Sequence, residues 1–514
     1  MLKKLLLPLL CCSIIGSATA QLSAGYLDTL VASTLKTFSV PGIAVGIVKD
    51  GKLIFAKGYG VRSLTTQQPV TPQTLFGIAS NSKAFTATAL GMLVDAGKLK
   101  WDDKVTDYLP EFQMFDPYVT REFTVRDLLT HRSGLGLGSG DLMFFPDGGN
   151  FTRQEAIHNI RFLRPVSSFR SKYDYDNNLY MVAGEIVKKV SGLEWEDFIE
   201  QRIMQPVGMI SSVASWNRIK NNTNVIDAHA PADGKVIQIP HDWNPVVNAA
   251  GGIMSNIDDL SKWLILQMKD GQLASGTQLI SKKNHAEMQQ LQTVIPTGPG
   301  YYNTHFYGYG LGWFLADVKG YKQVSHTGGL AGTVTQITML PELNLGIIVL
   351  TNQQQGAAFS SITNTIKDSY LGLPDHHWLD LYGKRYVTSN QQADSIKNAS
   401  NASLAALQKN KGAGLAPLNI AGTYQDAWFG KVSISNSNGK LEFLSEKSPR
   451  LKGELFRYSA ATYIVKWYDR SLDADAYCIF VLDKEGKPVS FTMEAISPLT
   501  DFSFDFQDLL LKKQ

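Results

Sequence analysis

The sequence predicts a mixed α/β protein with a large domain of helices and one sheet, followed by a small domain of strands alone. Within residues 26–370, β-rich runs lie at both ends and helical patterns lie between them, as expected when one sheet is assembled from both ends of a domain. From residue 420 onward the pattern changes to short alternating strands separated by turn residues. The polar stretch 390–415 between them ends in Gly412-Ala413-Gly414, so we expect a linker and two separate cores.

The first 20 residues have the pattern of a secretory signal peptide. Lys3 and Lys4 precede an apolar run over 5–15, and Ala18-Thr19-Ala20 precedes Gln21. The apolar run is too short to span a bilayer. Neither Cys11 nor Cys12 follows the small residue that a lipoprotein cleavage site needs, so we expect a periplasmic or secreted protein without a membrane anchor.

Composition excludes several classes of partner and cofactor. Removing Lys3 and Lys4 with the signal peptide would lower the net charge from +3 to +1, which argues against a nucleic-acid or anionic-membrane surface. Cys478 would then be the only cysteine, so no intrachain disulfide can form. The pair His376-His377 has no further ligands at metal spacing, and we expect neither a metal nor another cofactor. The expected partner is a small-molecule or peptide substrate, and homo-oligomerisation stays open.

The large domain begins with a helix and a hairpin. Residues 26–38 carry apolar side chains at helical spacing. The β-rich runs 43–48 and 53–61 are joined through Asp50-Gly51, a hairpin signal. After Leu75 and Phe76 a helical pattern begins at Ser80, and Gly97 is placed to cap it.

Later elements follow from the same two periodicities. Helices are expected at 178–190, 195–204, 258–268 and 357–370. Strands of the large domain are expected at 309–316, 322–325, 333–340 and 345–351. Strands of the small domain are expected at 432–435, 441–444, 462–467, 477–482 and 489–493. We therefore divide the chain into a signal peptide at 1–20, a large domain at 21–385, a polar helix and linker at 386–417 and an antiparallel β-domain at 418–514.

The strand-to-helix junction carries the chemistry. Ser80 stands at the start of the helix, and Lys83 lies one turn further on the same face. A serine hydroxyl is a poor nucleophile until a neighbour takes its proton, and an amine three residues on is near enough to do so. The same Ser-x-x-Lys pattern occurs at Ser33 and Ser437, but Ser33 lies inside a helix and Ser437 in a turn. Context therefore selects Ser80 as the nucleophile.

Two further motifs supply what acyl transfer needs beyond a nucleophile, namely a base and donors aimed at the oxyanion. Tyr175-Asp176-Asn177 places a phenol and an amide just before a helix. His326-Thr327-Gly328-Gly329 lies between two strand-like segments, where a glycine pair would let substrate backbone approach closely. Each motif alone is weak, but the three together in this order and context indicate one site.

These motifs resemble those of the class C β-lactamase and D-Ala-D-Ala carboxypeptidase-like serine hydrolases, a penicillin-binding-protein-like superfamily. The resemblance covers residues 26 to about 370 and includes the supporting stretches 128–135 and 250–255. It implies a β-lactamase/transpeptidase-like domain, with an antiparallel central sheet flanked by helices. The C-terminal part, with Ile420-Ala421-Gly422-Thr423-Tyr424, is similar to the lipocalin-like β-domain of some peptidases of this superfamily, which implies a small barrel.

The resemblance also implies a role for each site residue. Ser80 would be acylated, and Lys83 and Tyr175 would share the duty of general base. The ammonium of Lys83 would lower the pKa of the Tyr175 phenol toward neutrality. Asn177, His326, Thr327 and Gly328 would bind substrate, and the N–H groups of Ser80 and Gly329 would form the oxyanion hole. His131 is assigned to the scaffold.

Two departures shape the expected activity. His326 stands where class C β-lactamases have lysine, which argues against β-lactam hydrolysis. With an ordinary pKa it would be charged only on the acid side and could recognise a carboxylate there; alternatively it stays neutral and orients a hydroxyl or water. Asp176 replaces a more usual serine and brings an extra acid near the base.

The resulting prediction is a secreted serine hydrolase that acts through an acyl-enzyme on peptide or amide substrates of D-amino-acid type, or on esters. The alternatives are a true β-lactamase and a non-catalytic penicillin-binding or sensor module.

Overall fold

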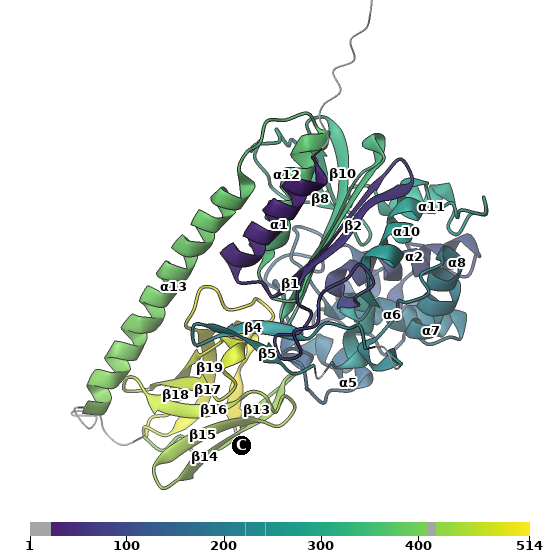
Figure 1. Cartoon of the computed structure of the whole chain (residues 1–514). Coiled ribbons are helices and arrows are strands. Elements are labelled where there is room, and N and C mark those ends of the chain that lie inside the picture. The colour runs from purple at the N-terminus through teal and green to yellow at the C-terminus, as the bar shows by residue number, and fades with distance from the viewer. Residues whose placement is uncertain (1–21, 221–222, 242, 410–417) are drawn as a thin grey trace, which may run out of the picture.

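A computed structural model describes residues 22–220, 223–241, 243–409 and 418–514, which form an α/β domain, a long helix and a β-barrel (Figure 1). The expected signal peptide at 1–20 and the linker residues 410–417 lie outside the described residues. Among those described, no helix is both long and apolar enough to span a membrane.

The sheet of the large domain is antiparallel and is assembled from both ends of the domain, as expected. Its strand order is β2-β1-β12-β11-β10-β9-β8-β7. In that order the strands are β2 (Lys52–Gly60), β1 (Gly42–Lys49), β12 (Leu345–Thr351), β11 (Thr333–Leu340), β10 (Tyr321–Leu330), β9 (Phe314–Val318), β8 (Tyr307–Tyr309) and β7 (Thr293–Val294). The first strand of the domain, β1, pairs with the last, β12.

Helices cover both faces of this sheet. Helices α1 (Ala24–Phe38) and α12 (Gly356–Tyr370) pack on one face, and α10 (Ile257–Met268) packs on the other (Figure 1). Along β12, Ile347 and Val349 join the core under α1 and α12, whereas Ile348 and Leu350 join the opposite core. Both faces of the central strands are therefore buried, which explains their continuous apolar runs.

The remaining elements of the large domain form the helical half and two small ribbons. The helices are α2 (Ser82–Asp95), α3 (Val105–Tyr108), α4 (Pro117–Glu122), α5 (Arg153–Asn159), α6 (Asn178–Ser191), α7 (Trp195–Phe198), α8 (Gln205–Val207), α9 (Asn248–Gly251) and α11 (Lys282–Met288). The ribbons pair β3 (Phe76–Gly77) with β6 (Met254–Ser255) and β4 (Ala228–Ala232) with β5 (Lys235–Ile239).

The C-terminal domain is a closed antiparallel barrel, which confirms the expected all-β class. Its strands are β13 (Gly422–Asp426), β14 (Gly430–Ser437), β15 (Lys440–Ser445), β16 (Lys452–Arg457), β17 (Thr462–Trp467), β18 (Ala476–Leu482), β19 (Pro488–Ala495) and β20 (Leu511–Lys513). The sequence analysis missed β13, β16 and β20, since their alternation is short or interrupted. Side chains such as Phe443, Trp467 and Phe491 fill the core.

Three expected elements differ in extent. The expected strand over 309–316 is two strands, β8 and β9, separated by a turn in which Gly312 has φ +80°. The expected helix over 195–204 passes from α7 into a π-helical turn at Ile199–Met204. The linker helix α13 (Trp378–Lys409) begins earlier than expected, so the boundary placed at residue 385 falls inside it.

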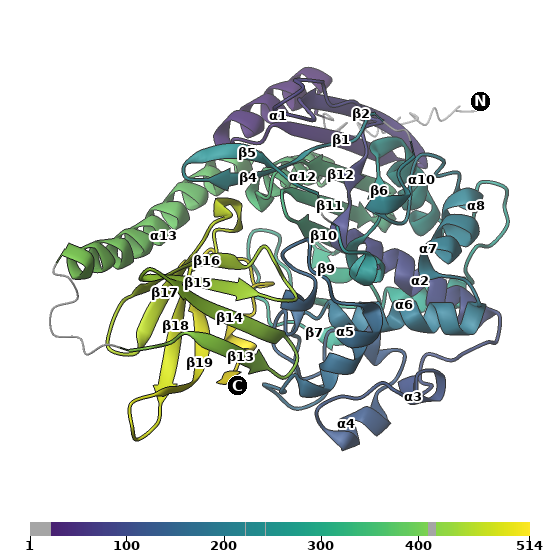
Figure 2. The same ribbon diagram turned by 90° about the horizontal axis from the view of Figure 1, so that it is seen from below.

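The two domains share one hydrophobic core, so the expectation of separate cores is wrong. A single cluster of buried side chains runs from Leu90 in α2 to Phe480 in β18. Hydrogen bonds cross the same contact, including Asn159 Nδ2 to the Trp428 carbonyl at 2.7 Å and the Asn150 amide to the Lys447 carbonyl at 2.9 Å. Figure 2 shows the barrel seated beside α5 of the large domain.

Removing residues 418–514 should therefore destabilise the large domain. It would uncover Phe145 and Phe151, which face Phe504 and Phe429, at a cost of about 1.5–3 kcal/mol for each exposed ring. We expect a shortened chain that aggregates or melts well below the full-length protein, measured by thermal denaturation and size exclusion. Asn159→Ala, which removes a single crossing hydrogen bond, should lower the melting temperature only slightly. A truncated chain that is monomeric and melts at the full-length temperature would contradict the shared core.

Candidate active site

The Ser80 turn is fixed by its neighbours before the helix begins. Ala79–Asn81 form a 3-10 turn that continues directly into α2, so Ser80 stands at the helix start as expected. Ala79 has φ +50°, and Asn81 Nδ2 donates to the Ile78 carbonyl at 3.0 Å and to Thr335 Oγ1 at 2.9 Å. These contacts hold the turn against β11 and leave the Ser80 side chain in the wall of a cavity.

Lys83 is buried and contacts the nucleophile. Its Nζ lies 3.0 Å from Ser80 Oγ, 2.7 Å from Asn177 Oδ1 and 3.0 Å from the Ala250 carbonyl. Within the described residues no carboxylate forms an ion pair with it. Burial lowers the pKa of Lys83 to about 7, against the opposing effect of the Asp141 charge. An amine with that pKa can accept the serine proton at neutral pH.

The pKa of Tyr175 moves in the opposite direction from the expected one. Its phenol is hydrogen-bonded to Ser80, and Lys83 Nζ lies 4.7 Å from the centre of its ring. Desolvation nevertheless raises the pKa of Tyr175 well above its ordinary value. The expectation of a pKa lowered toward neutrality is wrong, because burial is the largest influence on this group and it raises the pKa. At neutral pH the phenol keeps its proton, which leaves Lys83 as the group able to accept one.

Asn177 connects the lysine to an acid that the sequence analysis missed. Asn177 Nδ2 donates to Asp141 Oδ2 at 2.8 Å while its Oδ1 accepts from Lys83. Asp141 is fully buried, and this burial raises the pKa of its carboxyl to about 7. Its signal in the sequence was faint, an aspartate directly after the glycine-rich stretch 134–140. The substrate-binding role of Asn177 stays a prediction.

His326 is buried and its two ring nitrogens are occupied. Nε2 lies 2.8 Å from the Tyr309 hydroxyl, and Nδ1 lies 2.6 Å from the Thr327 carbonyl. The carbonyl requires a donor, so Nδ1 carries the proton and Nε2 accepts from Tyr309. Burial and the Lys83 charge lower the pKa of His326 to about 3. The expectation that it titrates near its ordinary value is wrong, and the neutral alternative describes the ring.

The two glycines after Thr327 serve different contacts. A Cβ at Gly328 would lie 2.2 Å from the Ile78 carbonyl oxygen, so this glycine permits β10 to approach the Ser80 turn rather than the substrate. A Cβ at Gly329 would meet only Val334, at 4.0 Å, and this residue lines the cavity together with Thr327. In the described chain, residues 326–330 pair with β11 alone, so their other edge is not paired with a strand. The oxyanion role of the Ser80 and Gly329 N–H groups stays a prediction.

His131 and Asp176 belong to the scaffold. His131 Nδ1 accepts from the Asp176 amide at 3.1 Å, and its ring lies 4.1 Å from that of Tyr175, centre to centre. The Asp176 carboxyl accepts from Ser133 Oγ at 2.6 Å, and burial raises its pKa well above the ordinary value. The extra acid is thus turned toward Ser133, and its burial disfavours the charged form.

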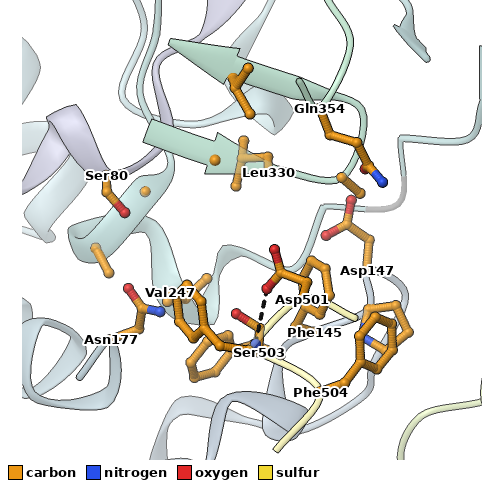
Figure 3. A pocket seen from close by; sticks show the side chains of 18 of the residues that line it. Ser80, Phe145, Asp147, Asn177, Val247, Leu330, Gln354, Asp501, Ser503 and Phe504 are labelled. Atoms are coloured by element: carbon orange, nitrogen blue, oxygen red, sulfur yellow. Dashed lines mark hydrogen bonds between the residues drawn. The ribbon is translucent and has the colours of Figure 1, made fainter. Parts of the chain in front are cut away.

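The cavity beside Ser80 has a volume of about 500 Å³ and receives side chains from both domains. Ser80 and Asn177 lie on one side of it, and the barrel segment that carries Asp501, Ser503 and Phe504 approaches from below (Figure 3). The sequence analysis assigned no site residue to the C-terminal domain. Among the described residues, no group of three or more His, Cys, Asp or Glu side chains is arranged to hold a metal ion.

An α/β fold with a serine at a helix start, a buried lysine on its hydroxyl and a cavity beside both defines a serine hydrolase. The chain belongs to the Beta-lactamase family, which residues 27–370 match. Residues 419–513 match a domain of unknown function, DUF3471.

Individual relatives agree with this class. The chain is 26% identical to unguisins hydrolase ungD of Aspergillus violaceofuscus over 392 residues, which is 72% of this chain and 69% of the relative. The octameric penicillin-binding protein homologue from Pyrococcus abyssi has the same fold, with a TM-score of 0.63 and 23% identity over 96% of this chain and 100% of that one. A class C β-lactamase aligns with a TM-score of 0.54 and 22% identity over 68% of this chain and 95% of that one.

The state of His326 predicts how the site responds to pH. A ring with a pKa of about 3 is neutral throughout pH 5–8, so it offers no titrating charge to a substrate carboxylate in that range. A substrate acid and its methyl ester should therefore show the same dependence of KM on pH. A KM that rises between pH 6 and 8 for the acid alone would contradict a neutral His326.

Proposed function

We propose that this protein is an exported serine hydrolase that cleaves amide or peptide bonds through an acyl-enzyme at Ser80. The observation that carries the proposal is the contact of 3.0 Å between Lys83 Nζ and Ser80 Oγ, with a lysine pKa of about 7. A nucleophile and base in contact at the mouth of a cavity satisfy the geometric requirement for acyl transfer. Export rests on the sequence pattern of residues 1–20 alone.

In the proposed reaction the Ser80 Oγ forms a bond to the acyl carbon and its proton passes to Lys83. The bond to the leaving amine then breaks as that nitrogen takes the proton from Lys83. Water hydrolyses the ester by the same transfers, so Ser80 and Lys83 return to their starting states. Tyr175 is protonated and hydrogen-bonded to Ser80, so its phenol is placed to donate a hydrogen bond to Ser80 Oγ while negative charge develops on that oxygen.

The charges that line the cavity favour a cationic substrate. Asp147, Asp473 and Asp501 line it together with a single arginine, Arg450, so carboxylates outnumber cations in the lining. Asp473 pairs with Lys397 at 3.3 Å and Arg450 pairs with Asp469 at 2.6 Å, which leaves the excess with the acids. Excess carboxylates in a cleft raise the local concentration of cations. The neutral His326 supplies no positive charge for a substrate carboxylate. Together these groups support amine-bearing substrates over the carboxylate-bearing ones of a carboxypeptidase or β-lactamase.

The apolar part of the lining sets a second preference. Phe144, Phe145, Trp243, Phe314, Phe502 and Phe504 contribute rings to the cavity. Such rings bury large apolar groups and stack on aromatic ones. We therefore propose an amide with a free amine and an apolar or aromatic side chain as the preferred substrate class.

Three p-nitroanilides of one aromatic amino acid test this preference: the free amine, the N-acetyl form and the N-succinyl form. We expect kcat/KM to fall in that order, by about tenfold or more from first to last, because the cavity carries negative charge. Asp501→Asn should reduce the ratio of kcat/KM for the free-amine substrate to kcat/KM for the N-succinyl substrate, since it removes one lining carboxylate.

Two serine variants complete that experiment. Ser80→Ala should hydrolyse none of the three substrates, whereas Ser437→Ala, at the exposed end of β14 rather than in the expected turn, should hydrolyse all of them at the wild-type rate. A preference for the succinyl substrate would refute the cationic specificity. Hydrolysis that survives Ser80→Ala would refute the nucleophile.

A further inference from the structure

An unbroken chain of hydrogen bonds runs from the barrel to the nucleophile. Ser503 Oγ donates to Asp141 Oδ2 at 2.9 Å, and the same oxygen accepts from Asn177 Nδ2 at 2.8 Å. Asn177 Oδ1 accepts from Lys83 Nζ, which contacts Ser80 Oγ. Asp141 Oδ2 and the Asn177 amide each bond to one group on either side of this chain, so a change at Ser503 reaches Lys83 through two intermediates.

The same barrel segment also fixes the backbone that carries Asp141. Asp505 accepts from the Gly140 amide at 2.5 Å and from the Leu142 amide at 3.1 Å. These are the residues on either side of Asp141 in the chain. A Cβ at Gly138 would lie 2.7 Å from the Phe502 ring, so the stretch before Asp141 is also packed tightly against the segment.

We propose that residues 502–505 of the barrel position the catalytic base of the other domain: Ser503 and Asp505 hold Asp141, and Asp141 holds Lys83 through Asn177. Asp141 and Ser503 are thus positioning residues for acylation of Ser80. This inference rests on the proposed function, because Lys83 must be the base that activates Ser80.

Charge explains why an acid is needed at the centre of this chain. Lys83 has no carboxylate in direct contact in the described structure, and Asp141 is the acid whose charge acts on it through Asn177. The second oxygen of Asp141, Oδ1, is buried and has no hydrogen-bond partner among the described residues. A proton on Oδ1 would therefore break no hydrogen bond, because Oδ2 is the oxygen that accepts from Asn177 and Ser503.

The sign of the coupling follows from these contacts. The Asp141 charge raises the pKa of Lys83, and the Ser503 hydrogen bond lowers the pKa of Asp141 by stabilising its charged form. Removing either group leaves less negative charge near Lys83 at neutral pH, so the pKa of Lys83 falls. The other titratable groups that face this pair are Tyr175, Asp176, Tyr180, His131, His326, Asp501 and Asp505.

The test is the rate at which an alkyl fluorophosphonate labels Ser80 across pH 5–9, followed by intact mass on the full chain. The labelling rate should rise with pH as Lys83 loses its proton, and we call this rising part of the pH profile the acid limb. In Asp141→Asn the acid limb should move to lower pH by about one unit, as expected for loss of a nearby charge. Its plateau should fall about tenfold, because Lys83 is less well oriented. Ser503→Ala should move the limb in the same direction by less, and Ser503→Thr, which keeps the hydroxyl, should restore it.

Ser497→Ala is the matched control, since Ser497 is a buried serine near the start of the same connection and accepts a hydrogen bond from the Leu499 amide. It should leave the acid limb unmoved. The proposal would be overturned if Asp141→Asn and Ser503→Ala were labelled more slowly but their acid limbs stood at the same pH as in the wild type. A merely structural role lowers the rate without moving the acid limb. If Asp141→Asn does not fold, the Ser503 pair decides alone.

The same measurement separates this inference from the proposed function. If the wild-type protein is labelled at Ser80 but the acid limb does not move in the variants, the positioning role is refuted and the hydrolase proposal stands. Wild-type protein that is not labelled at Ser80 would refute both, because a Lys83 that does not activate Ser80 has no acylation for Asp141 to tune.

Discussion

The burial of Lys83 without a directly paired carboxylate is the constraint on which the rest of the site depends. A buried amine that meets only a hydroxyl, an amide oxygen and a carbonyl pays a desolvation penalty for its charge, so its pKa falls into the neutral range. That single consequence supports the proposed role of the lysine as a base, whereas burial raises the pKa of Tyr175 and keeps its phenol protonated. The acid whose charge acts on it, Asp141, is linked to it through the Asn177 amide rather than by direct contact.

The contacts of Asp141 with the barrel would, under the proposed positioning role, join the two domains into one catalytic unit. Asp141 lies in the large domain, but its carboxylate and its flanking amides bond to Ser503 and Asp505 of the barrel. The barrel residues also form part of the cavity wall and share the core of the large domain. The C-terminal domain therefore supplies part of the cavity wall, part of the shared core and the hydrogen bonds that fix Asp141, on which its proposed effect on the base depends.

Much of this architecture could be predicted from sequence because its signals are local. The continuous apolar runs of β1 and β12, the capping glycine Gly97 and the spacing of Ser80 and Lys83 can be recognised from neighbouring residues. The remainder depends on distant partners. Asp141 meets Ser503 across 362 residues of sequence, and the neutrality of His326 follows from burial beside Tyr309 and Lys83. Sequence shows the kind of side chain at such positions but not how far it is removed from water.

The most direct test of the account is the titration of Lys83 itself. The protein can be prepared with 13C- and 15N-labelled lysine, and the Lys83 resonance assigned by its loss in Lys83→Met and followed by NMR between pH 5 and 11. The account predicts a midpoint of about 7, as burial and the indirect charge of Asp141 require. A midpoint near 10.5, the value of an ordinary lysine, would show that Lys83 stays charged at neutral pH and would contradict its role as the base.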